Sequence, residues 1–180
     1  MFSWKKFLKI LGTIFLIAFL AFFEISFISL LPAPFNHFSL FLPVIFFISI
    51  VVSYRQALWL GFLEGIILNI FSVFPFGSIS LSIIISLVVV NFLLNNFFTN
   101  KSLYSLIILG ILGNLIYLFN LILIKFIFFL FGIGGNDVSE ALSPFVLSES
   151  LWQNAFNILM LILFFYIFNF WGKKIKALFL

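Results

Sequence analysis

Few side chains in this 180-residue chain have the chemistry for catalysis or metal binding. There is one histidine, His37, and no cysteine, which excludes a cysteine nucleophile and thiolate metal ligands. The chain also lacks the HExxH and Gly-x-Ser-x-Gly motifs that mark zinc peptidases and serine hydrolases. A nucleophile with its base and orienting partner cannot be assembled from the remaining residues. We therefore expect a protein that is not an enzyme, with no catalytic residue, metal site or cofactor.

Three charged residues, Glu24, Glu64 and Lys125, lie inside long apolar stretches. A charge near the centre of a bilayer is costly unless it is paired, neutralised or close to the interface. Glu24 and Lys125 each lie about 10 Å from one end of their stretch, at a helical rise of about 1.5 Å per residue. They either pair with each other, or Glu24 is protonated while Lys125 extends towards the headgroups. Glu64 lies one or two turns from the end of its stretch, close enough to reach the interface.

The composition is typical of a membrane protein. Hydrophobic residues make up 65% and charged residues 8%, and the mean hydropathy is +1.37, which leaves too little polar surface to cover a soluble globule. The formal net charge of +4 comes from basic residues dispersed along the chain, without the basic stripe typical of nucleic-acid binding. We expect these residues to contact anionic membrane lipid and no nucleic acid.

Six apolar stretches predict a bundle of six transmembrane helices, a single all-α integral membrane domain over residues 1–180. The predicted spans are residues 7–31, 38–53, 57–72, 78–96, 103–131 and 151–171. A helix needs about 20 residues to cross the hydrocarbon core. The second and third spans are short for a crossing. The fifth is longer than needed, so we expect it to tilt or to bend near Gly110 and Gly113.

The connections between the spans contain the residues that interrupt helices. Pro32 and Pro34 are expected to end the first helix, since proline lacks an amide donor. Gly77 indicates a tight turn between the third and fourth spans. The longest connection, residues 132–150, predicts a flexible outer hinge and a short interfacial helix with Pro144 at its first position.

Basic residues mark alternate ends of the successive spans. Eight of the nine Lys and Arg residues lie before the first span, after the second, after the fourth or after the last: Lys5, Lys6, Lys9, Arg55, Lys101, Lys173, Lys174 and Lys176. The other three connections carry none. Because positive charge accumulates on the cytoplasmic side, this pattern predicts that both termini are cytoplasmic.

Two predicted spans carry small and polar residues along one face. In the third span these residues are Ala57, Gly61, Glu64, Gly65, Asn69 and Ser72. In the fifth span they are Gly110, Gly113, Asn114, Tyr117 and Asn120. Helices associate in lipid through close packing of small residues and through hydrogen bonds between helices. We expect the two faces to meet inside the bundle, where they either fix the helix register or line a ligand pocket.

The third span and the turn after it contain a longer pattern, Gly61-Phe62-x-x-Gly65-x-x-x-Asn69, followed by a short turn and Gly77. Glu24-Ile25, Pro32 and Leu42-Pro43 precede it. Together these residues resemble the MreD family of rod shape-determining membrane proteins. The family's signature is Gly-Phe-x-x-Gly-x-x-x-Asp, and Asn69 stands where the family usually has Asp. The amide of Asn69 can still donate and accept hydrogen bonds.

The resemblance implies a scaffold of the bacterial cell-elongation machinery, which controls cell shape and peptidoglycan synthesis. Such a scaffold is a multi-pass protein of the cytoplasmic (inner) membrane. Its expected partner is an MreC-like single-span protein, with indirect links to MreB-like filaments and to the wall-synthesis enzymes. The expected partner or packing face consists of Gly61, Phe62, Gly65, Asn69 and Gly77.

The alternative is a small solute-binding membrane subunit, such as the substrate-capture component of an energy-coupling-factor transporter. That class also has about this length and six spans. It would need polar and aromatic groups open to the outer face, for which the candidates are Asn114, Tyr117, Gln153, Asn154 and Asn157.

Overall fold

The computed structural model describes residues 4–33, 35–72, 74–98, 102–131 and 144–178. Over these residues the chain is all-helical and contains no strand, which confirms the all-α part of the predicted fold class. Three of the described helices are long and apolar enough to cross a membrane, over Ser78–Asn96, Leu103–Phe128 and Ser150–Phe170. Their lengths and compositions are those of a membrane protein.

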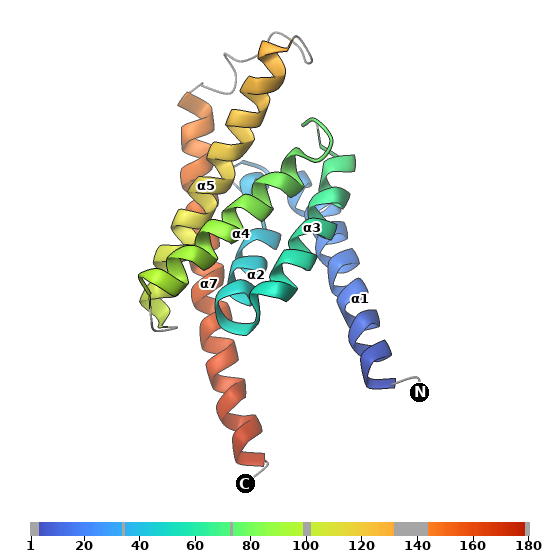
Figure 1. The fold of residues 1–180 in the computed structure, drawn as a ribbon, viewed down its shortest axis with the longest axis vertical. Helices are drawn as coiled ribbons and strands as arrows, with labels where there is room; N and C mark the ends of the chain where they lie inside the picture. The colour runs from blue at the N-terminus through green and yellow to red at the C-terminus, as the bar shows by residue number, and fades with distance from the viewer. Residues whose placement is uncertain (1–3, 34, 73, 99–101, 132–143, 179–180) are drawn as a thin grey trace.

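The helices form a bundle in which chain segments run up and down (Figure 1). The helices are α1 (Trp4–Ser26), α2 (Phe41–Phe47), α3 (Tyr54–Ile70), α4 (Ser78–Asn96), α5 (Leu103–Leu130) and α7 (Pro144–Leu178). A short π-helix, Ile48–Val52, extends α2, and 3-10 turns cover Ile28–Leu30 and Phe35–His37. The α3–α4 turn and the end of α5 lie at one end of the bundle, named the Gly77 end (Figure 1). The α2–α3 connection, the start of α1 and the end of α7 lie at the other, the Arg55 end.

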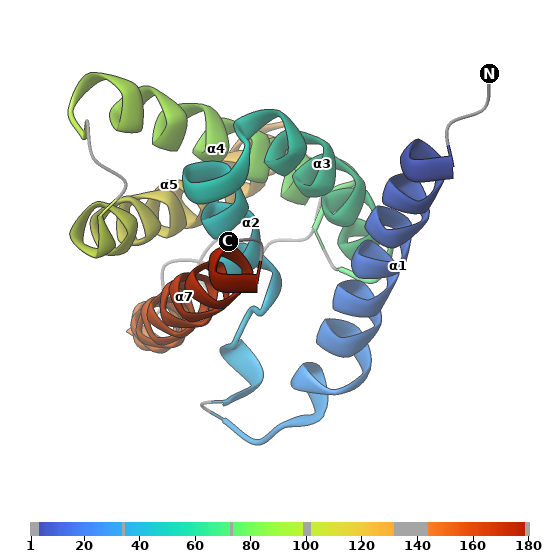
Figure 2. The same cartoon turned by 90° about the horizontal axis from the view of Figure 1, so that it is seen from below.

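The centre of the bundle is built around α4, which packs against both α3 and α5. Its buried side chains Ile83, Leu87 and Val90 belong to one apolar core with residues of every other helix. α5 packs in turn against α7, while α2 contacts both α7 and α1 (Figure 2). In this arrangement the small-residue face of α3 packs against α4. The small-residue face of α5 points towards α4, α2 and α7.

The first two predicted spans differ from the structure. α1 ends at Ser26, before Pro32 and Pro34, so the prolines do not end it. Two 3-10 turns, Ile28–Leu30 and Phe35–His37, follow instead, and Glu24 is hydrogen-bonded to residues just before and within α2. α2 with its π-helical extension covers only Phe41–Val52 and is too short to cross a bilayer core of about 30 Å at 1.5 Å per residue.

The last helix is longer than predicted. The short helix beginning at Pro144 and the span over 151–171 form one continuous helix, α7, which begins at Pro144 and ends at Leu178. No glycine or proline lies between Phe145 and Trp171 to interrupt it. The rest of the predicted outer connection, residues 132–143, and the turn at Lys101 lie outside the described residues.

Candidate functional site

The two glycines of the third predicted span allow α3 and α4 to approach closely. A Cβ atom built on Gly65 would lie 2.7 Å from the Cα of Ser80, and one built on Gly61 would lie 2.7 Å from the Cγ2 of Ile83. Carbon atoms do not approach this closely, so a larger side chain would push the two helices apart. The hydroxyl of Ser80 also donates to the carbonyl of Phe62 at 3.4 Å. Gly61 and Gly65 are therefore contact points within the bundle.

Asn69 closes the turn between α3 and α4. Its Nδ2 donates to the carbonyl of Pro75 at 2.8 Å and to that of Phe74 at 3.4 Å, while its Oδ1 accepts from the N–H of Ile79 at 2.9 Å. Gly77 lies inside this turn with φ +87°, a conformation that glycine adopts without strain. Asn69, which is itself buried, thus uses both halves of its amide to pair backbone groups of the turn and of the first turn of α4.

Phe62 does not share this interior position. It is 40% exposed, whereas Gly61 and Gly65 are buried against α4. Of the five residues predicted to form one partner or packing face, the structure brings Gly61, Gly65, Asn69 and Gly77 into the α3–α4 hairpin. It leaves the ring of Phe62 on the surface.

Glu24 accepts hydrogen bonds from residues at the start of α2. One carboxylate oxygen accepts a hydrogen bond from the hydroxyl of Ser39 at 2.8 Å, and the other accepts from the N–H of Phe41 at 3.1 Å. Ser39 also accepts from the N–H of Leu42 at 3.5 Å. The first amides of a helix have no partner within the helix itself. A carboxylate from α1 therefore satisfies a helix end that lies inside the bundle.

Glu24 and Lys125 do not form an ion pair, although both belong to the described residues. The partners of Glu24 are Ser39 and Phe41, and the side chain of Lys125 is partly buried on α5. Of the two arrangements left open by the sequence, the structure excludes the direct pair.

Glu64 is fully buried, so the expectation that it reaches the interface is wrong. Neither of its carboxylate oxygens has a hydrogen-bond partner among the described residues. It lies on the same side of α3 as Ala57, which is also fully buried. Its burial follows from its place on the small-residue face of α3, because α3 packs against both α4 and α1.

The polar face of α5 also points into the bundle. A Cβ atom on Gly113 would lie 2.8 Å from the ring of Phe46 and from Val90, and one on Gly110 would collide with the side chain of Leu161. Asn114 is fully buried, and neither atom of its amide has a partner among the described residues. Tyr117 is partly buried and packs against the apolar core. Asn120 donates to the carbonyl of Ile116 in its own helix.

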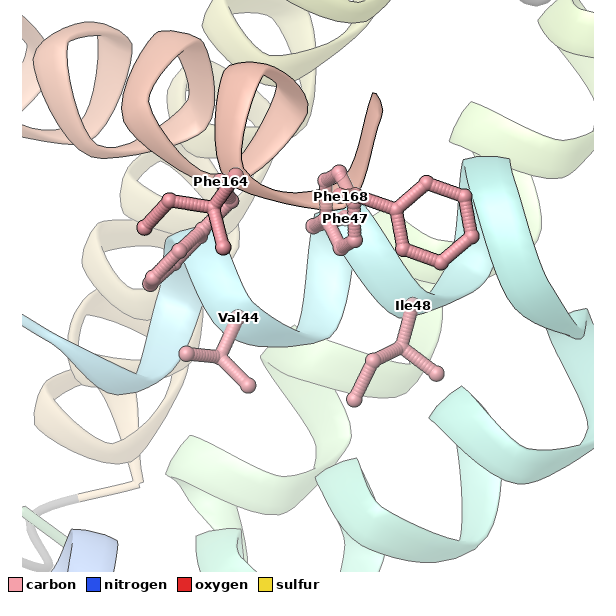
Figure 3. A pocket seen from close by; sticks show the side chains of 6 residues that line it. Val44, Phe47, Ile48, Phe164 and Phe168 are labelled. Atoms are coloured by element: carbon pink, nitrogen blue, oxygen red, sulfur yellow. The ribbon is translucent and has the colours of Figure 1, made fainter. Parts of the chain in front are cut away.

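Sequence reasoning missed Ser39 and the α2–α7 surface. Ser39 precedes the first turn of α2, and serine before an apolar run is a common start signal for helices, so it was recognisable. The sequence contains no such signal for the surface between α2 and α7. There an apolar groove of about 280 Å³ is lined by Val44, Phe47, Ile48, Phe164, Ile167 and Phe168 (Figure 3).

A second apolar groove continues along α7 towards the Gly77 end. It has a volume of about 220 Å³ and is lined by Leu31, Phe35, Phe38, Phe156, Leu159 and Met160. Phe156, Met160, Phe164 and Phe168 recur every four residues and so follow one face of α7. Every residue that lines the two grooves is apolar.

Comparisons of the chain with protein-family models, with curated proteins and with solved structures give no match. The likeness to the MreD family therefore rests on the motif residues and their neighbours. No group of three or more His, Cys, Asp or Glu residues that could hold a metal ion occurs in the part of the chain that the structure describes.

Proposed function

We propose that this chain is a non-enzymatic scaffold of the bacterial cell-elongation machinery, located in the cytoplasmic membrane. It binds an MreC-like single-span protein, and through that partner it connects MreB-like filaments with the wall-synthesis enzymes. The observation that best supports the proposal is the joint action of Gly65, Asn69 and Gly77. These three motif residues, which are spread over thirteen positions of sequence, build one structural unit, the α3–α4 hairpin.

The proposed orientation places the Arg55 end in the cytoplasm and the Gly77 end outside. Arg55 and the lysines that begin α1 and end α7 belong to the first end, and the α3–α4 turn at the second carries no basic residue. This distribution follows the rule that positive charge is retained on the cytoplasmic side.

The partner helix is proposed to dock on α7 rather than on the glycines of α3. Gly61 and Gly65 already contact α4, so they are not available to another protein. The two grooves beside α7 extend from Phe156 to Phe168, which is about 18 Å at the helical rise of 1.5 Å per residue. An apolar surface of this length suits an apolar single-span helix, which would pack there through van der Waals contact.

Site-specific photocrosslinking in growing cells of the native bacterium tests the proposal. A photoreactive phenylalanine analogue replaces Phe168, which is 52% exposed in the groove, or Phe119, which is 63% exposed on α5 and serves as the control. We expect position 168 to capture an identified MreC-like protein and position 119 to capture lipid only. We also expect rod-shaped cells to become round when the chain is depleted. Unchanged cell shape after depletion, with the same products from both positions, would contradict the proposal.

The alternative of a small solute-binding subunit stays a prediction. It would require a polar pocket that water and solutes reach from the outer face.

A further inference from the structure

Glu64 is an acidic residue in the middle of α3, inside the bundle. It lies ten residues from the start of the helix and six from its end, or about 15 Å and about 9 Å along the axis. It is 0% exposed, and its two carboxyl oxygens are inaccessible to water. Neither oxygen has a hydrogen-bond partner among the described residues. Bulk water and the described protein groups therefore leave this carboxyl group unsolvated.

The described elements around α3 bring no opposite charge to Glu64. α3 lies between α1 and α4 and also contacts α2 and the π-helix (Figure 2). α4, α2 and the π-helix contain no titratable residue, and on α3 itself Tyr54 and the exposed Arg55 lie nine or more residues away. α1 contributes Glu24, whose two oxygens accept hydrogen bonds elsewhere. The lysines of α1 lie in its first two turns, at the Arg55 end: Lys5, Lys6 and Lys9.

An ionised Glu64 would thus be an unpaired charge in an apolar bundle. Moving an isolated carboxylate out of water is so unfavourable that a buried carboxyl group takes up a proton instead. A neutral carboxylic acid without a hydrogen bond costs far less free energy at the same place. The packing of α3 between α1 and α4 therefore favours the protonated form of Glu64. Since this burial exists only while α3 is packed, protonation and packing depend on each other.

We propose that Glu64 is a proton-binding site that couples protonation of the chain to the packing of α3. The carboxyl group binds a proton when α3 packs against α1 and α4, and it releases the proton only when α3 separates from these helices. A rise in pH therefore weakens the packing of α3, because the packed state binds one proton more than the open state. The site is independent of the scaffold function, since it uses no residue of the grooves beside α7.

Infrared spectroscopy of the full chain tests the protonation. The C=O stretching band of a carboxylic acid lies at a higher frequency than the backbone amide band, and an ionised carboxylate lacks it. Micelles of an alkyl glycoside detergent add no C=O group of their own. At a pH of about 7, where an exposed glutamate is ionised, we expect the natural chain to show an acid band that Glu64→Gln loses. Glu24→Gln is the matched control and should retain that band. Identical spectra from the natural chain and from Glu64→Gln would overturn the proposal.

Deuterium exchange of the same band tests the coupling to packing. In D₂O the acid band moves to lower frequency when a deuteron replaces the bound proton, which requires Glu64 to meet water. Gly65→Ala pushes α3 away from α4, because the new Cβ would lie 2.7 Å from the Cα of Ser80. We expect this variant to exchange severalfold faster than the natural chain. Gly12→Ala, whose Cβ has no neighbour within 4 Å, should leave the rate unchanged. Equal rates in the two variants would overturn the coupling.

The pH dependence of unfolding tests the sign of the coupling. Above a pH of about 5 an exposed glutamate is ionised, so unfolding releases the proton that Glu64 holds in the bundle. The unfolding equilibrium constant of the natural chain should therefore rise with pH relative to that of Glu64→Gln, by up to about tenfold per pH unit. If the buried amide prevents Glu64→Gln from folding, Glu64→Met replaces it in both measurements. A ratio that stays constant or falls with pH would overturn the proposal.

Discussion

The side-chain oxygen of Asn69 accepts a hydrogen bond from the backbone N–H of Ile79 at 2.9 Å, ten residues further along the chain. The same amide donates to the carbonyls of Phe74 and Pro75. One side chain thus connects the end of α3, the turn and the first turn of α4. The residue type at this position consequently affects the whole hairpin.

Replacing Asn69 by Leu should lower the free energy of unfolding by about 2–4 kcal/mol, since three hydrogen bonds from a buried side chain to the α3–α4 hairpin are lost. Asn69→Asp keeps an acceptor for Ile79 but no donor for the two carbonyls when it is ionised, and it should cost about 1–3 kcal/mol. Unfolding in detergent micelles measures the change in the free energy of unfolding for both variants. An Asp variant as stable as the natural chain would show that the donated bonds contribute nothing.

Replacing Gly65 by Ala should destabilise the α3–α4 contact by about 1–3 kcal/mol, because the new methyl group would meet the backbone of Ser80, which cannot rotate away. Gly12→Ala is the matched control. Gly12 also lies in a helix, and a Cβ there has no neighbour within 4 Å, so the change should be neutral or stabilising by up to about 1 kcal/mol. Equal effects of the two substitutions on the thermal unfolding midpoint would contradict the packing role of Gly65.

The half-buried Glu24 and the fully buried Glu64 should respond to substitution in opposite ways. Glu24→Ala leaves the N–H of Phe41 and the hydroxyl of Ser39 unpaired and should cost about 2–4 kcal/mol. Glu64→Met replaces an unpartnered buried carboxyl group with an apolar chain of similar size and should stabilise the protein by about 1–3 kcal/mol. Chemical unfolding of both variants measures these changes in the free energy of unfolding. A loss for Glu64→Met comparable to that of Glu24→Ala would reveal a partner for Glu64.

The two ends of the bundle should be labelled from opposite sides of the membrane. Single cysteines at Val52, which is 51% exposed at the Arg55 end, and at Phe76, which is 74% exposed at the Gly77 end, report the orientation without removing a charge. A membrane-impermeant maleimide added to intact cells should label position 76 at once and position 52 only after permeabilisation. The reverse order would mean that the basic residues face outwards.

The parts of the fold that depend on local pattern were predictable. α4 begins and ends at the predicted residues because Gly77 precedes it and the polar pair Asn95 and Asn96 ends it. The glycines of α3 and α5 were assigned to the interior from their helical spacing, and the structure places them against α4, α2 and α7.

The parts that depend on contacts between distant residues were not predictable. Residues Phe27 to Leu31 are as apolar as the helix before them, so nothing local indicates that α1 ends at Ser26. The hydrogen bonds of Glu24 with Ser39 and Phe41 join residues fifteen and seventeen positions apart. The contact of Gly110 with Leu161 likewise depends on the register of α5 against α7.

The short α2 helix has a consequence for biogenesis. With its π-helical extension it spans about 18 Å, so as a segment leaving the ribosome it is too short to be recognised as a membrane crossing of its own. Its first amide is satisfied only when Glu24 is already in place. α1 must therefore be integrated first and must stay beside the newly synthesised segment, so that the N-terminal third of the protein enters the lipid as one cooperative unit.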